Sequence, residues 1–184
     1  MALTPSNPFP LGSTAPDFNL QEPLSGKERS LQEIKGEKGT VIFFICNHCP
    51  YVHHVNPELV PLALDYESNG IRCIGISSND VANYPEDAPE KMAEVAKQLH
   101  YPFPYLYDES QAVAKAYDAA CTPDFYVFDA DLKCVYHGQL DDSRPGNDAP
   151  LNGHSLRAAI DALLLGKAPL IEQKPSIGCG IKWK

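Results

Sequence analysis

Residues 41–50 read VIFFICNHCP, an apolar run that ends in two cysteines, a histidine and a proline. The β-branched and aromatic side chains of Val41–Ile45 predict a central strand that is covered on both faces. Pro50 favours the first position of a helix, and apolar residues follow it at spacings of three and four. The stretch therefore predicts a strand–helix unit with Cys46 and Cys49 at the junction.

Outward from this unit, predicted strands and helices alternate along the chain. The helix after Pro50 is expected to end at Asn69-Gly70, and Pro57 and Pro61 are expected to kink it. Further strands are predicted at residues 17–20, 71–76, 103–107, 125–128 and 134–137, and further helices at residues 92–99, 113–120 and 156–164. This alternation predicts an α/β fold, a three-layer α/β/α sandwich with a mixed central sheet.

Length and charge restrict the class of protein. The 184 residues predict one domain, residues 1–170, followed by a basic tail at residues 171–184 that carries Cys179. A formal net charge of −9 argues against binding to nucleic acid, whose phosphate backbone is negative. No apolar run in the sequence reaches the roughly 18 residues of a membrane span, and the N-terminus lacks the features of a signal peptide. We therefore expect a cytoplasmic protein without a membrane partner.

Cys49 is the predicted nucleophile. It directly precedes Pro50 and therefore falls at the N-terminus of the helix, whereas Cys46 lies at the exit of the strand. Unpaired backbone N–H groups and the helix dipole stabilise a thiolate at a helix N-terminus, which lowers the pKa of the thiol. His48 and His53 can add positive charge at this site or carry protons.

Three motifs of the chain resemble those of a known family. Residues 12–20, GSTAPDFNL, resemble the opening motif of the alkyl hydroperoxide reductase/thiol-specific antioxidant (AhpC/TSA) group, the redoxins of the thioredoxin superfamily. Cys49 and Pro57 reproduce the family's spacing between the active cysteine and a proline in the following helix. Residues 121–129, CTPDFYVFD, resemble the family's cis-proline segment. The resemblance spans about residues 12–166 and implies a thioredoxin-like fold.

The resemblance also implies site residues and a reaction. Thr122 and Pro123 are expected to lie against the active cysteine and, with His48, to contact the substrate. The implied activity is that of a thiol-based oxidoreductase without a cofactor, acting on a peroxide or a protein disulfide. A thioredoxin-like or other thiol reductant would return the oxidised protein to its dithiol form. A homodimer is one expected assembly.

Departures from the family pattern favour disulfide exchange or a general antioxidant activity over peroxide reduction. Peroxiredoxins place Thr or Ser three residues before the peroxidatic cysteine and Pro four residues before that, where this chain has Cys46 and Ile42. The second cysteine of thioredoxin-like reductases is replaced here by Val52. Arg144 is a candidate for the arginine with which peroxidatic sites hold the thiolate and the peroxide.

A second cysteine is needed to resolve the oxidised nucleophile. Cys46 is the first candidate because it is closest in sequence, and Cys121 is the second because it precedes the cis-proline segment. Cys179 is the third candidate, since it lies between two glycines on the C-terminal tail. Cys73 and Cys134 lie within predicted strands and are interpreted as core residues.

Other interpretations use the same residue types. Cys46 and Cys49 with His53 or His54 offer ligands at spacings that zinc or copper accepts, which predicts metal binding as the alternative function. A thioredoxin-like scaffold used only for binding is a further alternative. Four loop aspartates are interpreted as solvated surface groups rather than as a catalytic pair of carboxylates: Asp80, Asp87, Asp141 and Asp142.

Overall fold

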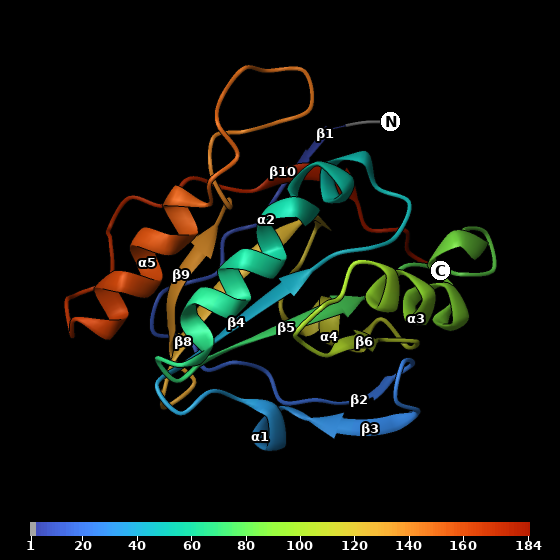
Figure 1. Ribbon diagram of the computed structural model, residues 1–184, viewed down its shortest axis with the longest axis horizontal. Helices are drawn as coiled ribbons and strands as arrows, with labels where there is room; N and C mark the ends of the chain where they lie inside the picture. Colours follow the sequence, from blue (N-terminus) through green and yellow to red (C-terminus); the bar gives the residue numbers. More distant parts are fainter. Residues whose placement is uncertain (1–2) are drawn as a thin grey trace.

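The computed structural model describes residues 3–184, which form two sheets (Figure 1). The large sheet has seven strands in the order β3-β2-β6-β5-β4-β8-β9, and the small sheet has three in the order β1-β10-β7. The strands are β1 (Leu3–Pro5), β2 (Asn19–Glu22), β3 (Lys27–Ser30), β4 (Gly39–Phe44), β5 (Ile71–Ser77), β6 (Tyr105–Tyr107), β7 (Cys121–Thr122), β8 (Asp124–Asp129), β9 (Cys134–Gly138) and β10 (Ile177–Gly180). The helices are α1 (Leu31–Ile34), α2 (Pro50–Glu67), α3 (Pro89–Gln98), α4 (Ala112–Ala116), α5 (His154–Leu164) and the short 3₁₀ helix η1 (Pro85–Asp87).

β4 lies at the centre of the large sheet. It is parallel to β5 and antiparallel to β8, so the sheet is mixed, as predicted. Helices α2, α3 and α5 supply Val52, Met92 and Ile160 to the apolar core on one face of the sheet. On the other face, α1 and α4 supply Leu31 and Val113 to a second core. The predicted three-layer α/β/α sandwich is therefore confirmed (Figure 1).

Pro57 and Pro61 are the residues at which the sequence predicts a kink in the helix. Helix α2 continues through both of them. Each proline removes only one backbone donor, and the buried face of the helix, which includes Val55 and Leu59, packs on the sheet and offsets that loss. Gly70, with a φ of 85°, turns the chain into β5 at the predicted end of the helix.

Several element boundaries differ from the predicted ones. β2 begins at Asn19 instead of residue 17, and β6 begins at Tyr105 instead of residue 103. Helix α4 ends at Ala116, four residues early, because Asp118 has a left-handed φ of 51° that cannot continue a helix.

The C-terminal segment returns to the fold beside the start of α2 (Figure 1). β10 lies between β1 and β7 and is antiparallel to both. β7 is followed directly by a cis peptide bond between Thr122 and Pro123. Within residues 3–184, no helix combines the length and the apolar character that crossing a membrane requires. The predicted domain boundary at residue 170 and the predicted compartment stay predictions.

Candidate functional site

Cys49 occupies the position before the first turn of α2. β4 ends at Phe44, and the chain turns through four residues before Cys49 becomes the N-cap of the helix, with Pro50 at the first helical position. The Cys49 carbonyl accepts the first helical hydrogen bond, from the His53 N–H at 3.0 Å. The thiol therefore faces the N-terminal end of the helix, where backbone N–H groups lack helical partners.

The Cys49 sulfur lies in a cluster of hydrogen-bonding groups. Its Sγ is 2.8 Å from the Sγ of Cys179 and 3.3 Å from the carbonyl oxygen of Thr122. The pKa of Cys49 is lowered to about 5, chiefly by a hydrogen bond from Cys46 and further by Cys179, Thr122 and the Val52 N–H. These interactions outweigh burial, which alone would raise the pKa. The lowered pKa favours the thiolate form at neutral pH.

Cys46 stabilises the thiolate form of Cys49. Its own pKa is raised well above the ordinary value, first by its bond to Cys49, then by burial and by the negative charge of Asp87. It therefore stays protonated, and its sulfur also lies 3.5 Å from the Thr122 hydroxyl. An S–H group thus stands where the family resemblance expects the hydroxyl of Thr or Ser.

Cys179 reaches Cys49 because β10 approaches β7 closely. A Cβ atom on Gly178 would lie 2.0 Å from the Thr122 carbonyl oxygen, so only glycine fits at that position. The Cys179 pKa is raised to about 12 by burial and by the neighbouring Cys49. Cys179 is thus a thiol held against a thiolate.

The chain beyond Cys179 is anchored on its far side. The Lys182 N–H donates to the Asn79 side chain at 2.8 Å, and the Lys182 carbonyl accepts from Gln111 and from the Asp80 N–H, both at 2.8 Å. These bonds, together with the small sheet, place Cys179 at its own chain's site.

The remaining three cysteines do not contact Cys49 through a hydrogen bond. The Cys121 sulfur lies 3.9 Å from the Pro123 carbonyl, and burial raises the Cys121 pKa. Cys73 and Cys134 belong to the two apolar cores, as predicted, and burial raises the pKa of each to about 12.

His48 is fixed by a carboxylate that the sequence did not reveal as a site residue. Its Nδ1 lies 2.6 Å from Asp87 Oδ2, and its ring stacks on Tyr84 with 5.1 Å between the centroids. Its Nε2 is buried and has no hydrogen-bond partner within residues 3–184. Asp87 also accepts from the backbone N–H groups of Asn47 and His48 and from the side chain of Asn79, so it holds the loop before α2.

The interpretation of the loop aspartates as solvated groups is therefore wrong for three of them. Asp80, Asp87 and Asp141 are buried, because each carboxylate accepts hydrogen bonds from backbone N–H groups of its own loop or the loop beside it. Asp142 is exposed, as expected. Asp87 had one sequence signal: it follows β5, and the carboxyl ends of parallel strands β4 and β5 meet at one edge of the sheet.

The predicted metal ligands are not brought together. His53 bonds to the Asn47 carbonyl, and His54 Nε2 lies 2.7 Å from the Ser143 hydroxyl. Within residues 3–184, the group whose ligand atoms lie within 4.8 Å of one another is Cys46, His48 and Asp87. The proposed set with His53 or His54 is wrong because both rings turn toward other partners.

Arg144 does not hold the thiolate. Its guanidinium donates to the carbonyl groups of Asp141 and Ser143 and to the Gln139 side chain, at 2.6 to 2.7 Å. Thr122 and Pro123 do lie where the resemblance implies, since the Thr122 carbonyl is in contact with the Cys49 sulfur. Whether these residues and His48 contact a substrate stays a prediction.

Comparisons with known proteins identify the family of the chain. A model of the AhpC/TSA family matches residues 11–137, a range that includes Cys46, Cys49 and the cis-proline but ends before Cys179. No significant match was found among curated proteins.

Solved structures give closer likenesses. An uncharacterised conserved protein from Geobacillus kaustophilus is 61% identical, with a TM-score of 0.98 over 100% of this chain and 97% of that one. A hypothetical protein from Sinorhizobium meliloti is 46% identical, with a TM-score of 0.95 over 98% of each chain. The thioredoxin domain of a thiol-disulfide oxidoreductase from Bacteroides vulgatus is 19% identical, with a TM-score of 0.62 over 83% of this chain and 99% of that one. The expected thioredoxin-like fold is confirmed.

Proposed function

Because this chain belongs to the AhpC/TSA family, we propose that it is a thiol oxidoreductase with Cys49 as the nucleophile and Cys179 as the resolving cysteine. The observation that carries the proposal is the pair of sulfurs at the start of α2, which lie 2.8 Å apart. One of them is a thiolate at neutral pH and the other is a thiol. Cys46 then serves as a donor to the thiolate, although the sequence ranked it first as the resolving residue.

The reaction balances with the two sulfurs and a substrate disulfide. The Cys49 thiolate attacks one substrate sulfur, forms a mixed disulfide and releases the other substrate sulfur as a thiolate, which takes up a proton. Cys179 then loses its proton, attacks the Cys49 sulfur and releases the second substrate thiol. The substrate has gained two electrons and the protein has lost two, which an external thiol reductant restores.

Disulfide exchange is favoured over peroxide reduction by the surroundings of the thiolate. Peroxide cleavage requires a positive charge and hydroxyl donors at the departing oxygen. Within residues 3–184 no hydrogen bond joins the Arg144 guanidinium to the Cys49 sulfur, and the residue before the Asn47-His48 pair is a cysteine instead of Thr or Ser. The thiolate that leaves a disulfide is a more stable leaving group than the oxygen that leaves a peroxide, so it requires fewer stabilising donors.

Access to Cys49 depends on β10. Cys49 is fully buried and Cys179 is 4% exposed, so a substrate sulfur reaches Cys49 only when β10 separates from β7. That strand has only four residues, and its pairing with β7 involves only the residues Cys179 and Gly180. Short, weakly paired segments open at low free-energy cost compared with core strands.

His48 is the proposed proton carrier of the cycle. Asp87 holds Nδ1, which leaves Nε2 as the ring atom that exchanges a proton, and Nε2 is the buried atom without a partner. The imidazole can receive the Cys179 proton and give it to the departing substrate sulfur. Thr122 and Pro123 are proposed to line the path of the substrate beside the dithiol.

The test uses fully reduced, metal-free protein. One sample receives one equivalent of bis(2-hydroxyethyl) disulfide and a parallel sample receives one equivalent of hydrogen peroxide, followed by peptide mapping under non-reducing conditions. We expect Cys49 joined to Cys179, faster with the disulfide. Cys49 remaining a free thiol with both oxidants would show the proposal to be wrong, and faster oxidation by peroxide would reverse the substrate assignment.

Two matched variants separate the candidate resolving residues. Cys179→Ser is expected to accumulate a mixed disulfide between Cys49 and the reagent, because no thiol then displaces it. Cys46→Ser is expected to form the bond between Cys49 and Cys179 as the natural chain does. A mixed disulfide that accumulates in Cys46→Ser and not in Cys179→Ser would transfer the resolving role to Cys46.

Metal binding is a second candidate function, favoured by the cluster of Cys46, His48 and Asp87. Thiolate, imidazole and carboxylate together suit zinc. The cluster competes with hydrogen bonds already made, since Asp87 accepts from four N–H groups. Titration of the reduced protein with zinc tests it: stoichiometric binding that is lost in His48→Gln would support the site, and no binding would remove it.

A further inference from the structure

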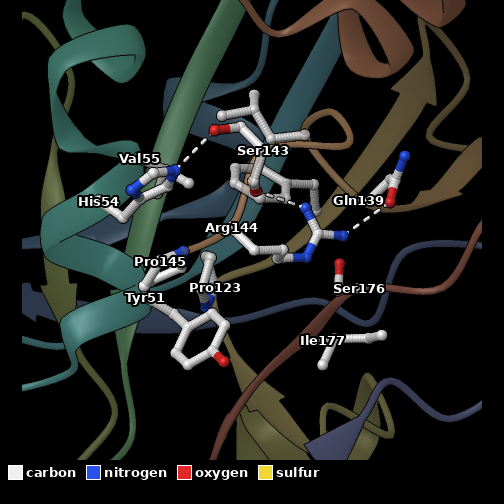
Figure 2. A pocket seen from close by; sticks show the side chains of 12 residues that line it. Tyr51, His54, Val55, Pro123, Gln139, Ser143, Arg144, Pro145, Ser176 and Ile177 are labelled. Carbon is white, nitrogen blue, oxygen red and sulfur yellow. Dashed lines mark hydrogen bonds between the residues drawn. The ribbon is translucent and has the colours of Figure 1, made fainter. Parts of the chain in front are cut away.

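A pocket is lined by residues from the segments that carry Cys49, the cis-proline and Cys179 (Figure 2). Tyr51 lies two residues after Cys49, Pro123 follows Thr122, and Ile177 lies two residues before Cys179. The cavity volume of the pocket is only about 10 Å³, about that of one water-sized sphere, so it has room for a single small polar group. Some lining residues are thus sequence neighbours of Cys49, Thr122 and Cys179, where a substrate would react.

The remaining wall is the loop after β9, which places Arg144 in the pocket (Figure 2). The guanidinium lies between Ser143 and Gln139, and its three hydrogen bonds all go to neutral oxygens: two carbonyl groups and the Gln139 amide. The Nε–H takes part in none of the hydrogen bonds found within residues 3–184.

The charge of Arg144 is also without a carboxylate partner in the part of the chain that the structure describes. None of the ion pairs there includes Arg144. The two nearest acids in sequence face other donors: Asp141 accepts from the N–H groups of Asn152 and Gly153, and Asp142 pairs with Lys174 at 2.9 Å. A half-buried guanidinium with a free donor and no counter-charge is a site for an anion.

Other polar groups line the pocket, and the hydroxyl of one of them, Ser176, donates to the Gly138 carbonyl at 2.7 Å. His54 and the Ser143 hydroxyl lie 2.7 Å apart on one wall, and the Ser176 side chain lies on the opposite side of the guanidinium (Figure 2). No carboxylate is among the residues that line the pocket. The apolar contribution of Val55, Phe125 and Leu140 lowers the local dielectric, which strengthens the attraction for one negative group.

We propose that this pocket binds a carboxylate of the substrate, and that the substrate is therefore a disulfide whose sulfur lies a short chain away from a carboxylate. This inference rests on the proposed function for the reaction, but the anion site can be tested without any reaction. Arg144 is a specificity residue in this view.

Binding is measured first, in the Cys49→Ala variant, which cannot form the mixed disulfide. The probes are a series of small disulfides of increasing chain length that end in carboxylates, with bis(2-hydroxyethyl) disulfide as the neutral counterpart. We expect the carboxylates to shift the NMR resonance of the Arg144 Nε–H and the neutral compound to leave it in place. An unmoved resonance with every carboxylate would overturn the proposal.

Reactivity is measured next, in the natural chain and in Arg144→Gln. A protein of net charge −9 with a thiolate nucleophile repels anions, so without a built site the neutral disulfide should react faster. We expect the best carboxylate to react about tenfold faster than the neutral compound, the gain typical of one charge-assisted hydrogen bond. In Arg144→Gln this preference, measured as the ratio of the carboxylate rate to the neutral rate in the same variant, should disappear.

Two controls distinguish charge from loop structure. Arg144→Lys keeps the charge and should retain part of the preference for carboxylates. Arg72→Gln removes an arginine near the first residue of β5, at the end of that strand away from the dithiol, and should retain all of the preference. A preference that survives in Arg144→Gln contradicts the proposal. If carboxylates bind but no disulfide oxidises the natural chain, the anion site stands and the proposed function falls.

Discussion

Cys49 and Cys73 are both buried thiols, yet their acidities lie far apart. Cys49 follows β4 at the start of α2, and Cys73 lies in the neighbouring strand β5. Cys49 has a pKa lowered to about 5, whereas Cys73 has a pKa raised to about 12. Cys73 lies inside β5 among apolar side chains, where burial is the main influence. Cys49 is equally hidden from water but receives hydrogen bonds from Cys46, Cys179 and the first turn of α2.

The difference shows that burial by itself predicts an inert thiol in this fold. What converts a buried cysteine into a nucleophile is the set of donors around it, and these come from a helix N-terminus and from other side chains. Placing Cys49 one position before α2 supplies the first kind of donor, and β10 supplies part of the second.

The largest expected effect is on the pH dependence of thiol reactivity. At pH 7 the thiolate fraction of Cys73 should be about 10⁵-fold below that of Cys49, given a pKa of about 12 for the former. Alkylation with iodoacetamide, followed residue by residue by mass spectrometry, should give a midpoint near pH 5 for Cys49. A midpoint for Cys49 near 8 or above would break the comparison.

The same titration has a consequence for stability. The Cys49 pKa is lower in the folded chain than in the unfolded one, so the folded state binds fewer protons. The stabilisation is fully present above pH 9 and is lost as the pH falls toward about 5. Urea unfolding of Cys49→Ala should lack this part of the pH dependence.

Replacing each of the two cysteines by alanine gives the next largest effect. Cys49→Ala should reduce the rate of disulfide reduction by about 10³-fold or more, because the bond-forming atom is removed. Cys73→Ala should keep the full rate and lose only the packing of one sulfur. Equal losses in the two variants, measured with bis(2-hydroxyethyl) disulfide at equal folded fractions, would contradict the assignment of Cys49.

Substitution of a glycine beside Cys179 can move Cys179 away from Cys49 without replacing either cysteine. Gly178→Ala places a Cβ 2.0 Å from the Thr122 carbonyl, so β10 must move away and carry Cys179 with it. We expect closure of the bond between Cys49 and Cys179 to slow by about 10²-fold, as for other small misplacements of reacting groups.

Gly180→Ala is the matched control, because its Cβ would meet the Thr4 side chain at 3.1 Å and the Ala120 carbonyl only at an ordinary contact distance of 3.9 Å. Closure is measured by quenched-flow trapping of free thiols. Closure that is unaffected in Gly178→Ala would mean that β10 does not need the close approach to β7.

The smallest expected effect comes from the donor at residue 46. Cys46→Ala removes the largest cause of the low Cys49 pKa, and the midpoint of alkylation should rise by about one unit, a tenfold loss of thiolate below the midpoint. Cys46→Thr supplies a hydroxyl donor and should restore a midpoint close to that of the natural chain. A midpoint that does not move in Cys46→Ala would assign the low pKa to the helix N-terminus and Cys179 alone.

Much of the fold and part of the site follow from local sequence. The apolar run before Cys46, the proline after Cys49 and the apolar period of α2 are local signals, so the strand, the helix and the N-terminal position of Cys49 could all be predicted. The core positions of Cys73 and Cys134 follow in the same way from the apolar residues beside them.

The partners of the site could not be predicted, because they depend on contacts between distant segments. Asp87 lies 39 residues from His48, and no local pattern distinguishes it from the exposed Asp142. The pairing of histidines with a metal failed for a related reason: His53 and His54 have suitable spacing, but hydrogen bonds to other loops decide where their rings point.

The sequence by itself determined the α/β sandwich and which cysteine lies at a helix N-terminus, because strand and helix periods and proline positions act over a few residues. Only the tertiary structure decided which other thiol contacts Cys49. Cys179 lies 130 residues from Cys49 and outside the matched family range, and it arrives because β10 pairs with β1 and β7 and because Gly178 lets it pack against Thr122. Such a contact is set by sheet pairing and close packing, which no short stretch of sequence encodes.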